Sequence, residues 1–248
     1  MIFSGLLAAS LLASCAARPS PRVVVSLPEK SAVYQDLALR AAVVRSLRAQ
    51  GVLQFRSPFS RSRDRVVLLI RSPLDLRVES LLEFGAAGYE AVSLGGEFSI
   101  FWPLSGEYFR GIGTREEMQR HLSFPLAPEE AIPLILSAVR LEPEADYRLE
   151  EKKGRLWLRG LRADIEIEEA DGRYRPVEVV WRSLEGTATH RIRYGDFSEI
   201  SGISFPRSIE GRFSAHRLRL VLEEVELNPS LETQLFRLDI PEHAHRIC

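Results

Sequence analysis

Residues 203–227 decide the fold, and they read ISFPRSIEGRFSAHRLRLVLEEVEL. Apolar and polar side chains alternate in the first half of this stretch: Ile203, Phe205, Ile209 and Phe213 against Ser204, Ser208, Glu210 and Arg212. That period of two is typical of a strand with one buried face. The alternation predicts two strands, Ile203–Phe213 and His216–Leu227. In the second strand the period slips at Glu223-Glu224, which predicts a β-bulge. Because no helix separates the halves, we expect antiparallel pairing.

The same alternation recurs along most of the chain, between turn signals such as Ser57-Pro58 and Gly95-Gly96. Further strands are expected at Val52–Arg56, Arg65–Arg71, Leu76–Phe84, Tyr89–Leu94, Phe98–Trp102, Tyr108–Ile112, Tyr147–Glu151, Leu156–Arg159, Ala163–Glu168, Val177–Arg182, Thr187–Tyr194 and Gln234–Leu238. About eleven to thirteen strands predict one large antiparallel sheet that twists and curls. One face should pack on the core and the other should face water.

Three segments predict helices. Residues 29–48 have apolar positions at helical spacing, and Arg115–Leu122 is a short amphipathic segment. The run from Pro128 to Val139 is apolar nearly all round, so a helix there must be buried on several sides. We therefore predict a mainly β (α+β) protein: an open half-barrel of about eleven strands, plugged on its concave side by short helices.

Composition excludes several classes of function. Lys and Arg total 33 and Asp and Glu total 34, a balance that argues against a nucleic-acid-binding protein. Only two cysteines occur, so neither a disulfide framework nor a cysteine metal site is expected. His243 and His245 could be metal ligands, but they lie in a segment expected to be a disordered tail. No catalytic motif is present, so the sequence predicts neither an enzyme, a cofactor nor a metal.

The N-terminus carries a second signal. Residues 2–12 are an apolar run too short to span a bilayer, as in a signal peptide. Leu12-Ala13-Ser14-Cys15 resembles the lipobox of bacterial lipoprotein signal peptides. The resemblance implies cleavage after residue 14, attachment of palmitate-type acyl chains to Cys15, and, from Ala16, the outer membrane. We therefore divide the chain into a signal peptide (1–14), a lipidated Cys15 with a Pro/Ser tether (15–28), one domain (29–241) and a C-terminal tail (242–248).

Several local motifs resemble the LolA/LolB, or lipoprotein-localisation, superfamily in their order along the chain. They are LRAQGVLQF (47–55), RSPL followed by LRVESLLEF (71–84), PLILSAVRLEP (133–143), YGDFSEISGISFPRSIE (194–210) and LFRLDIP (235–241). The helix motif of the receptor branch contains Trp and Gly, which are missing from residues 133–143 here. The resemblance implies a half-barrel that carries lipid-modified proteins or lipids between membranes.

The expected function is binding or transfer of a lipid or acylated ligand by a periplasm-facing outer-membrane lipoprotein. Its partners would be the membrane, the ligand and an envelope transport partner; the alternative is an interaction lipoprotein docked on an envelope assembly. The densest aromatic cluster precedes the helical insert and is either core beneath it or one wall of an apolar cavity. The candidate cavity residues are Phe98, Ile100, Trp102, Phe109, Leu134, Ile135, Trp157 and Trp181.

Overall fold

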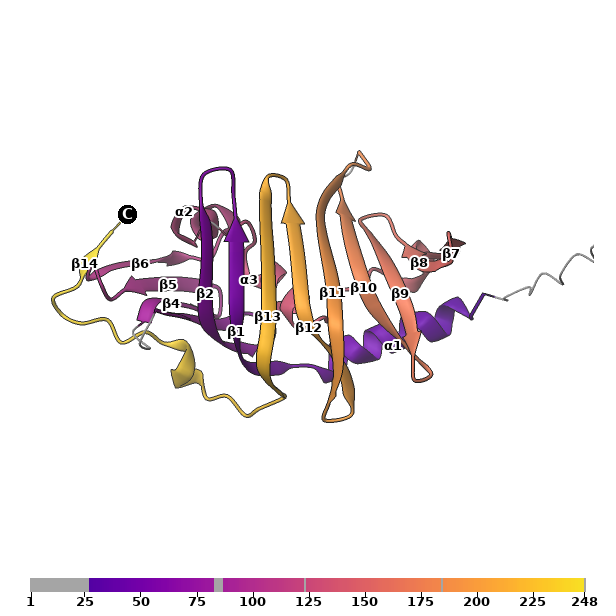
Figure 1. Cartoon of the computed structure of the whole chain (residues 1–248), viewed down its shortest axis with the longest axis horizontal. Coiled ribbons are helices and arrows are strands. Elements are labelled where there is room, and N and C mark those ends of the chain that lie inside the picture. Colours follow the sequence, from indigo (N-terminus) through magenta and orange to yellow (C-terminus); the bar gives the residue numbers. More distant parts are fainter. Residues whose placement is uncertain (1–26, 83–86, 123, 184, 248) are drawn as a thin grey trace, which may run out of the picture.

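The computed structural model describes residues 27–82, 87–122, 124–183 and 185–247. Cys15, the predicted signal peptide and most of the predicted tether lie outside the described residues, as does Cys248. The described residues contain three α-helices and fourteen strands of one sheet (Figure 1).

The helices are α1 (Lys30–Val43), α2 (Arg115–Leu122) and α3 (Pro128–Ile135), with short 3₁₀ turns at η2 (Glu144–Asp146) and η3 (Thr233–Phe236). The strands are β1 (Ser46–Arg56), β2 (Arg61–Arg71), β3 (Asp75–Leu81), β4 (Ala87–Leu94), β5 (Glu97–Trp102), β6 (Glu107–Ile112), β7 (Arg148–Lys152), β8 (Arg155–Arg159), β9 (Ala163–Ala170), β10 (Arg173–Arg182), β11 (Ala188–Ile200), β12 (Ile203–Phe213), β13 (His216–Leu227) and β14 (His245–Arg246).

The strand order shows two meanders joined side by side. It runs β14-β6-β5-β4-β3-β2-β1-β13-β12-β11-β10-β9-β8-β7, so the sheet stays open, with β14 and β7 at its edges. The join is the β1–β13 pair, which places Leu47 opposite Leu227. All neighbours are antiparallel except β14 and β6. The mainly β, open-sheet prediction is thus confirmed; the sheet is larger than predicted and is not wholly antiparallel.

All three helices lie on one face of this sheet. Strand pairing places Leu68 of β2, Ala91 of β4 and Phe109 of β6 in one row across the sheet, so these side chains share a face. Leu68 belongs to the buried cluster that includes residues of α1 and α3, whereas Ala91 and Phe109 pack with Met118 of α2. We call this side the helix-covered face and the opposite side the open face.

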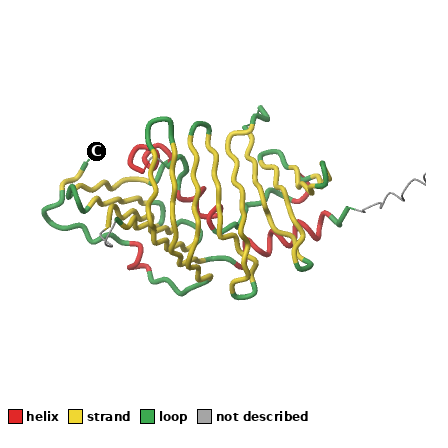
Figure 2. Tube along the Cα trace, viewed as in Figure 1, coloured by secondary structure: helices red, strands yellow, loops and turns green. Residues whose placement is uncertain are grey.

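The sheet changes direction strongly along its length. In Figure 1, β1, β2 and β13 lie along the vertical of the view, whereas β4, β5 and β6 lie across it at the other end of the first meander. The helices are short compared with the long curved sheet that they cover (Figure 2). Large antiparallel sheets curl because each strand is twisted relative to its neighbour.

Two predicted helices end earlier than expected. The predicted helix over 29–48 ends at Val43, and β1 begins at Ser46. The backbone N–H groups of Arg45 and Ser46 donate to Asn228 Oδ1, and the pairing with β13 that follows outweighs the local helical spacing. The predicted helix from Pro128 to Val139 ends at Ile135, because Ser137 adopts a left-handed conformation, with φ of 51°.

Two further expectations are decided near the C-terminus. The predicted strand Gln234–Leu238 is wrong: its start lies in η3, where Phe236 is buried beneath the Arg71 guanidinium. Residues 245–246 pair with β6, so this part of the predicted tail is ordered.

The predicted bulge is confirmed. Gln50 pairs with Glu224 and Gly51 with Leu222, which leaves Glu223 as the extra residue. Gly51 is required at this point, because an added Cβ would lie 2.1 Å from the Val221 carbonyl oxygen.

Candidate functional site

A hollow of about 990 Å³ lies beside the chain segment that leads into α1. It is bordered by that segment, the β7–β8 turn and parts of β8, β9, β10 and β11. The apolar residues at its border are Leu27, Leu156, Ile167, Tyr174, Val177 and Tyr194. A space of this size is in the range of small-molecule binding sites.

The border of the hollow also carries charge, mostly negative. Glu151, Glu166, Glu168, Glu169 and Glu178 border it together with Arg155 and Arg193. Two pairs of these charges neutralise each other on the open face, since Arg155 lies 3.2 Å from Glu166 and Arg193 lies 3.0 Å from Glu178. Glu151 and Glu169 lie on the helix-covered side, because they pair with Leu156 and Tyr174. The hollow therefore suits a ligand with an apolar part and a neutral or positively charged polar part.

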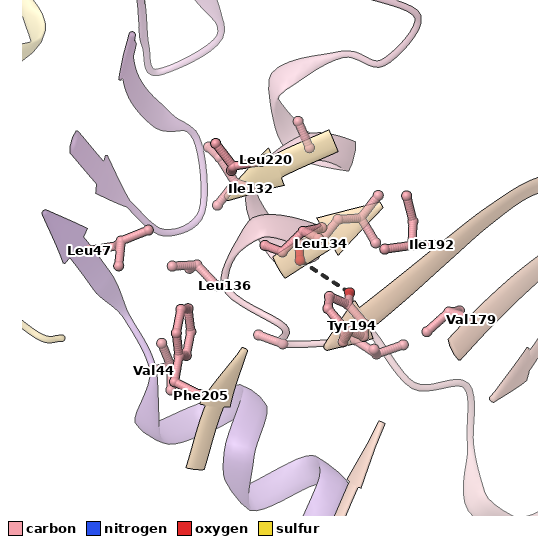
Figure 3. Close-up of a cluster of buried hydrophobic side chains, with 14 of the residues drawn as sticks. Val44, Leu47, Ile132, Leu134, Leu136, Val179, Ile192, Tyr194, Phe205 and Leu220 are labelled. Atoms are coloured by element: carbon pink, nitrogen blue, oxygen red, sulfur yellow. Dashed lines mark hydrogen bonds between the residues drawn. The ribbon is translucent and has the colours of Figure 1, made fainter. Parts of the chain in front are cut away.

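Helix α3 fills the centre of the helix-covered face next to this hollow. Ile132, Leu134 and Leu136 are buried among residues of β1, β11, β12 and β13 (Figure 3). The Tyr194 hydroxyl of β11 donates a hydrogen bond of 3.1 Å to the Leu134 carbonyl oxygen. Burial raises the pKa of Tyr194, so this hydroxyl stays protonated and remains a donor. Because Tyr194 also borders the hollow, it connects α3 to the hollow's border.

A half-buried arginine ties α1 to the turn after α3. Arg40 Nε donates to the Ser137 carbonyl oxygen at 3.2 Å and to the Ser137 hydroxyl at 3.0 Å. Its Nη2 atom is buried without a hydrogen-bond partner, and no carboxylate of a described residue lies within 4 Å of the guanidinium group. Burial lowers the pKa of Arg40 to about 10. The charge is thus held by two neutral oxygens of one residue.

Four of the sequence-predicted cavity residues form a packed cluster beneath α2. Phe98, Ile100 and Phe109 are buried, and Trp102 packs at their side. His121 of α2 stacks on Phe109 with ring centroids 4.0 Å apart, and it lies 6.0 Å from Trp102. None of the four borders the 990 Å³ hollow. In this structure the four residues pack as core beneath α2, and their predicted role in binding a ligand stays a prediction.

The other four predicted residues lie in separate places. Leu134 and Ile135 belong to α3, and Trp181 of β10 packs at the helix-covered face, 6.2 Å from His190. Trp157 is between Leu156 and Leu158, which join the core on the helix-covered side, so its own side chain lies on the open face. There it packs under the Arg159 guanidinium at 4.2 Å. Trp157 is therefore not part of the concave lining.

The sequence reasoning missed Arg40, Ser137 and the contact made by Tyr194. A signal for Arg40 was present, because Val33 and Leu37 mark the buried stripe of α1 and Arg40 falls on the same stripe. A charged residue at such a position predicts a buried polar contact. Its partner could not be predicted, since Ser137 is distant in sequence.

Two further features are absent from the described part of the chain: a metal-binding cluster and a membrane-spanning helix. No group of three or more His, Cys, Asp or Glu residues there is arranged to hold a metal ion. Among those residues, none of the helices is both long enough and apolar enough to cross a membrane.

Comparison with known proteins gives structural matches only. No protein-family model matches the sequence, and no curated protein sequence matches it. A LolA superfamily protein from Nitrosomonas europaea matches with a TM-score of 0.54 and 18% identity, over 82% of this chain and 97% of that one. The fold is LolA-like.

Two more solved structures share this LolA-like fold. A candidate outer membrane lipoprotein-sorting protein domain from Vibrio parahaemolyticus has a TM-score of 0.53 at 12% identity, over 84% of this chain and 97% of that one. A DUF1329 family protein from Desulfovibrio piger has a TM-score of 0.53 at 10% identity, over 83% of this chain and 97% of that one. These matches confirm the predicted resemblance at the level of the fold.

Proposed function

We propose that this protein is a lipid-anchored outer-membrane lipoprotein, facing the periplasm, that binds or transfers a lipid or an acylated ligand. The observation that carries the proposal is the 990 Å³ hollow beside α1, bordered by apolar residues of β8 to β11. The LolA-like fold and the lipobox at Cys15 support it. The role is non-enzymatic, and an envelope transport partner would deliver or remove the ligand.

The ligand's apolar part would occupy the hollow and extend along the helix-covered face. That extension requires α3 to shift, which would break the Tyr194–Leu134 hydrogen bond and the hydrogen bonds from Arg40 to Ser137. Leu134 and Ile135 would then border the ligand, with Trp181 on the sheet beneath. The cluster around Phe98 would contribute only if α2 moved as well.

The test fills the hollow with a larger side chain. Val177 lies at the bulge of β10 and borders the hollow, so Val177→Trp should weaken binding of a fluorescent fatty-acyl probe about tenfold. The matched control is Val221→Trp on β13, where the side chain lies between core-facing neighbours and therefore on the open face. Equal probe affinity in both variants and the parent would refute the proposed site.

Lipid attachment has a separate test. Protein made in cells fed labelled palmitate should carry the label, and Cys15→Ala should not. Label remaining at the parent level on Cys15→Ala would contradict anchoring at this residue without bearing on the hollow.

The second candidate is an interaction lipoprotein that docks on an envelope assembly. It is favoured by the tight packing of the helix-covered face, where Ile132 and Leu136 are each 1% exposed. Native mass spectrometry of protein purified without added lipid separates the two. Co-purifying lipid supports carriage, whereas ligand-free protein that also fails to bind the acyl probe supports docking.

A further inference from the structure

Two neighbouring hairpins end in a row of arginines. Pairing places Arg61 of β2 opposite Arg56 of β1, Arg56 opposite Arg217 of β13, and Arg217 opposite Arg212 of β12. We call these four residues the arginine row. The β1–β2 and β12–β13 loops lie at the same end of these four strands in Figure 1.

The arginine row lies on the open face. Residues that are directly opposite on paired strands share a face, so the four side chains lie on the same side. Leu218 and Phe213, which neighbour Arg217 and Arg212 in sequence, both belong to the core on the helix-covered side. Because side chains alternate along a strand, the arginines point the other way.

The row is unfavourable without an outside partner. Like charges directly opposite one another destabilise a sheet. Over the described residues, no carboxylate lies within 4 Å of any of the four guanidinium groups. Elsewhere on the same face charges are matched, since Arg191 and Arg193 each lie 3.0 Å from Glu178. The arginine row therefore presents positive charge that neighbouring described carboxylates do not neutralise.

An exposed aromatic residue stands beside this charge. Phe59 is in the four-residue loop between β1 and β2, and it is 98% exposed. Together with Arg56, Arg61 and Arg217, it borders a hollow of about 430 Å³. A large apolar side chain in water next to cations is the arrangement found where proteins meet the lipid–water boundary, because that boundary offers phosphate and an apolar layer within a few ångströms.

We propose that the two hairpin tips form a docking surface for the anionic headgroups of a phospholipid bilayer. The arginine row binds headgroup phosphates by charge-assisted hydrogen bonds, and the Phe59 ring enters the boundary between headgroups and acyl chains. Four arginines at one edge of a chain with net charge −1 give local charge complementarity to such a surface. This docking does not depend on the 990 Å³ hollow.

The test measures vesicle binding by the full chain carrying Cys15→Ala, so that no acyl anchor contributes. Co-sedimentation with vesicles of phosphatidylcholine and phosphatidylglycerol is compared with co-sedimentation with phosphatidylcholine alone. Arg56→Gln with Arg217→Gln should weaken the anionic-vesicle affinity about thirtyfold, since each basic residue near such a surface contributes about fivefold. Phe59→Ser should weaken it about tenfold.

The matched control removes the same charge elsewhere. Arg140 and Arg148 are exposed and lie outside the hairpin tips, so Arg140→Gln with Arg148→Gln should retain affinity within about threefold. The melting temperature of the Arg56/Arg217 double variant should not fall, because removing facing like charges relieves repulsion.

Three results would overturn the proposal: parent-level binding by the double variant, an equal loss in the control, or equal binding to the two vesicle types. Tighter, arginine-row-dependent binding of a single-stranded oligonucleotide would assign the row to nucleic acid instead.

Discussion

Substituting the half-buried Arg40 should change the free energy of unfolding by the difference between two opposing contributions. Its pKa falls from 12.5 to about 10 on burial, which corresponds to roughly 3 kcal/mol against the charged form at about 1.36 kcal/mol per pKa unit. The two hydrogen bonds to Ser137 offset this, because a bond from a charged donor contributes about 1.5 kcal/mol or more. Arg40→Met removes both effects, so the free energy of unfolding should change by less than about 1 kcal/mol.

Ser137→Ala separates these effects. It keeps the charge buried but deletes the hydroxyl acceptor, and it adds little backbone strain because both residues are disfavoured at a φ of 51°. The loss should be about 1 to 3 kcal/mol. Urea unfolding followed by tryptophan fluorescence measures both variants.

The pH dependence follows from the same lowered pKa. As pH rises, the folded state loses the Arg40 proton at a lower pH than the unfolded state does, so the free energy of unfolding of the parent should rise only above about pH 10. Between pH 6 and pH 8, the difference in free energy of unfolding between the parent and Arg40→Met should stay constant. A loss above about 3 kcal/mol for Arg40→Met would refute the reasoning, because it would mean that a counter-charge accompanies Arg40.

Three other substitutions test the packing of the helix-covered face. Leu134→Ala should lower the free energy of unfolding by about 2–5 kcal/mol, because the side chain is 7% exposed in a packed site. A loss under about 1 kcal/mol in urea unfolding would mean that α3 is a loosely packed lid. Tyr194→Phe should cost about 0.5–1.5 kcal/mol, since one buried hydrogen bond to Leu134 is lost; a thermal unfolding curve identical to the parent's would argue against that bond. Trp102→Ala should lower the melting temperature and leave acyl-probe affinity unchanged, because Trp102 packs against His121 under α2. An unchanged melting temperature with weakened probe affinity would place Trp102 in a binding cavity.

The sequence predicted the sheet well because alternation is a local property. Strands such as Ile203–Phe213 and His216–Leu227 were predicted with the bounds that the structure shows, and the bulge at Glu223 followed from one phase slip. The β1–β13 pair could not be predicted, because its partners are far apart in the chain and any apolar strand would have matched the pattern. The arginine row depends on that pair and was missed for the same reason.

The candidate site was harder to predict than the fold. The spacing of Phe98, Ile100 and Trp102 correctly placed them on one strand face, but spacing does not show how closely the next helix covers that face. The 990 Å³ hollow is bordered by β8 to β11 and the segment before α1, which are brought together only by the sheet's curl. A hollow depends on how the elements are positioned relative to one another, and the periodicity of a sequence does not give those positions.

The β1–β13 join also has a consequence for the order of folding. β1 pairs locally with β2 on one side, but on the other side Leu47 pairs with Leu227, which is synthesised much later than β1. Each meander can form hairpins early, since its contacts are close in sequence. Until β13 arrives, β1 remains an unpaired edge with an apolar face, the kind of surface on which chains aggregate. We expect the docking of the two meanders to be a slow, late step of folding. In a chain truncated before His216, β1 would stay unpaired on this side and the protein would be prone to aggregate.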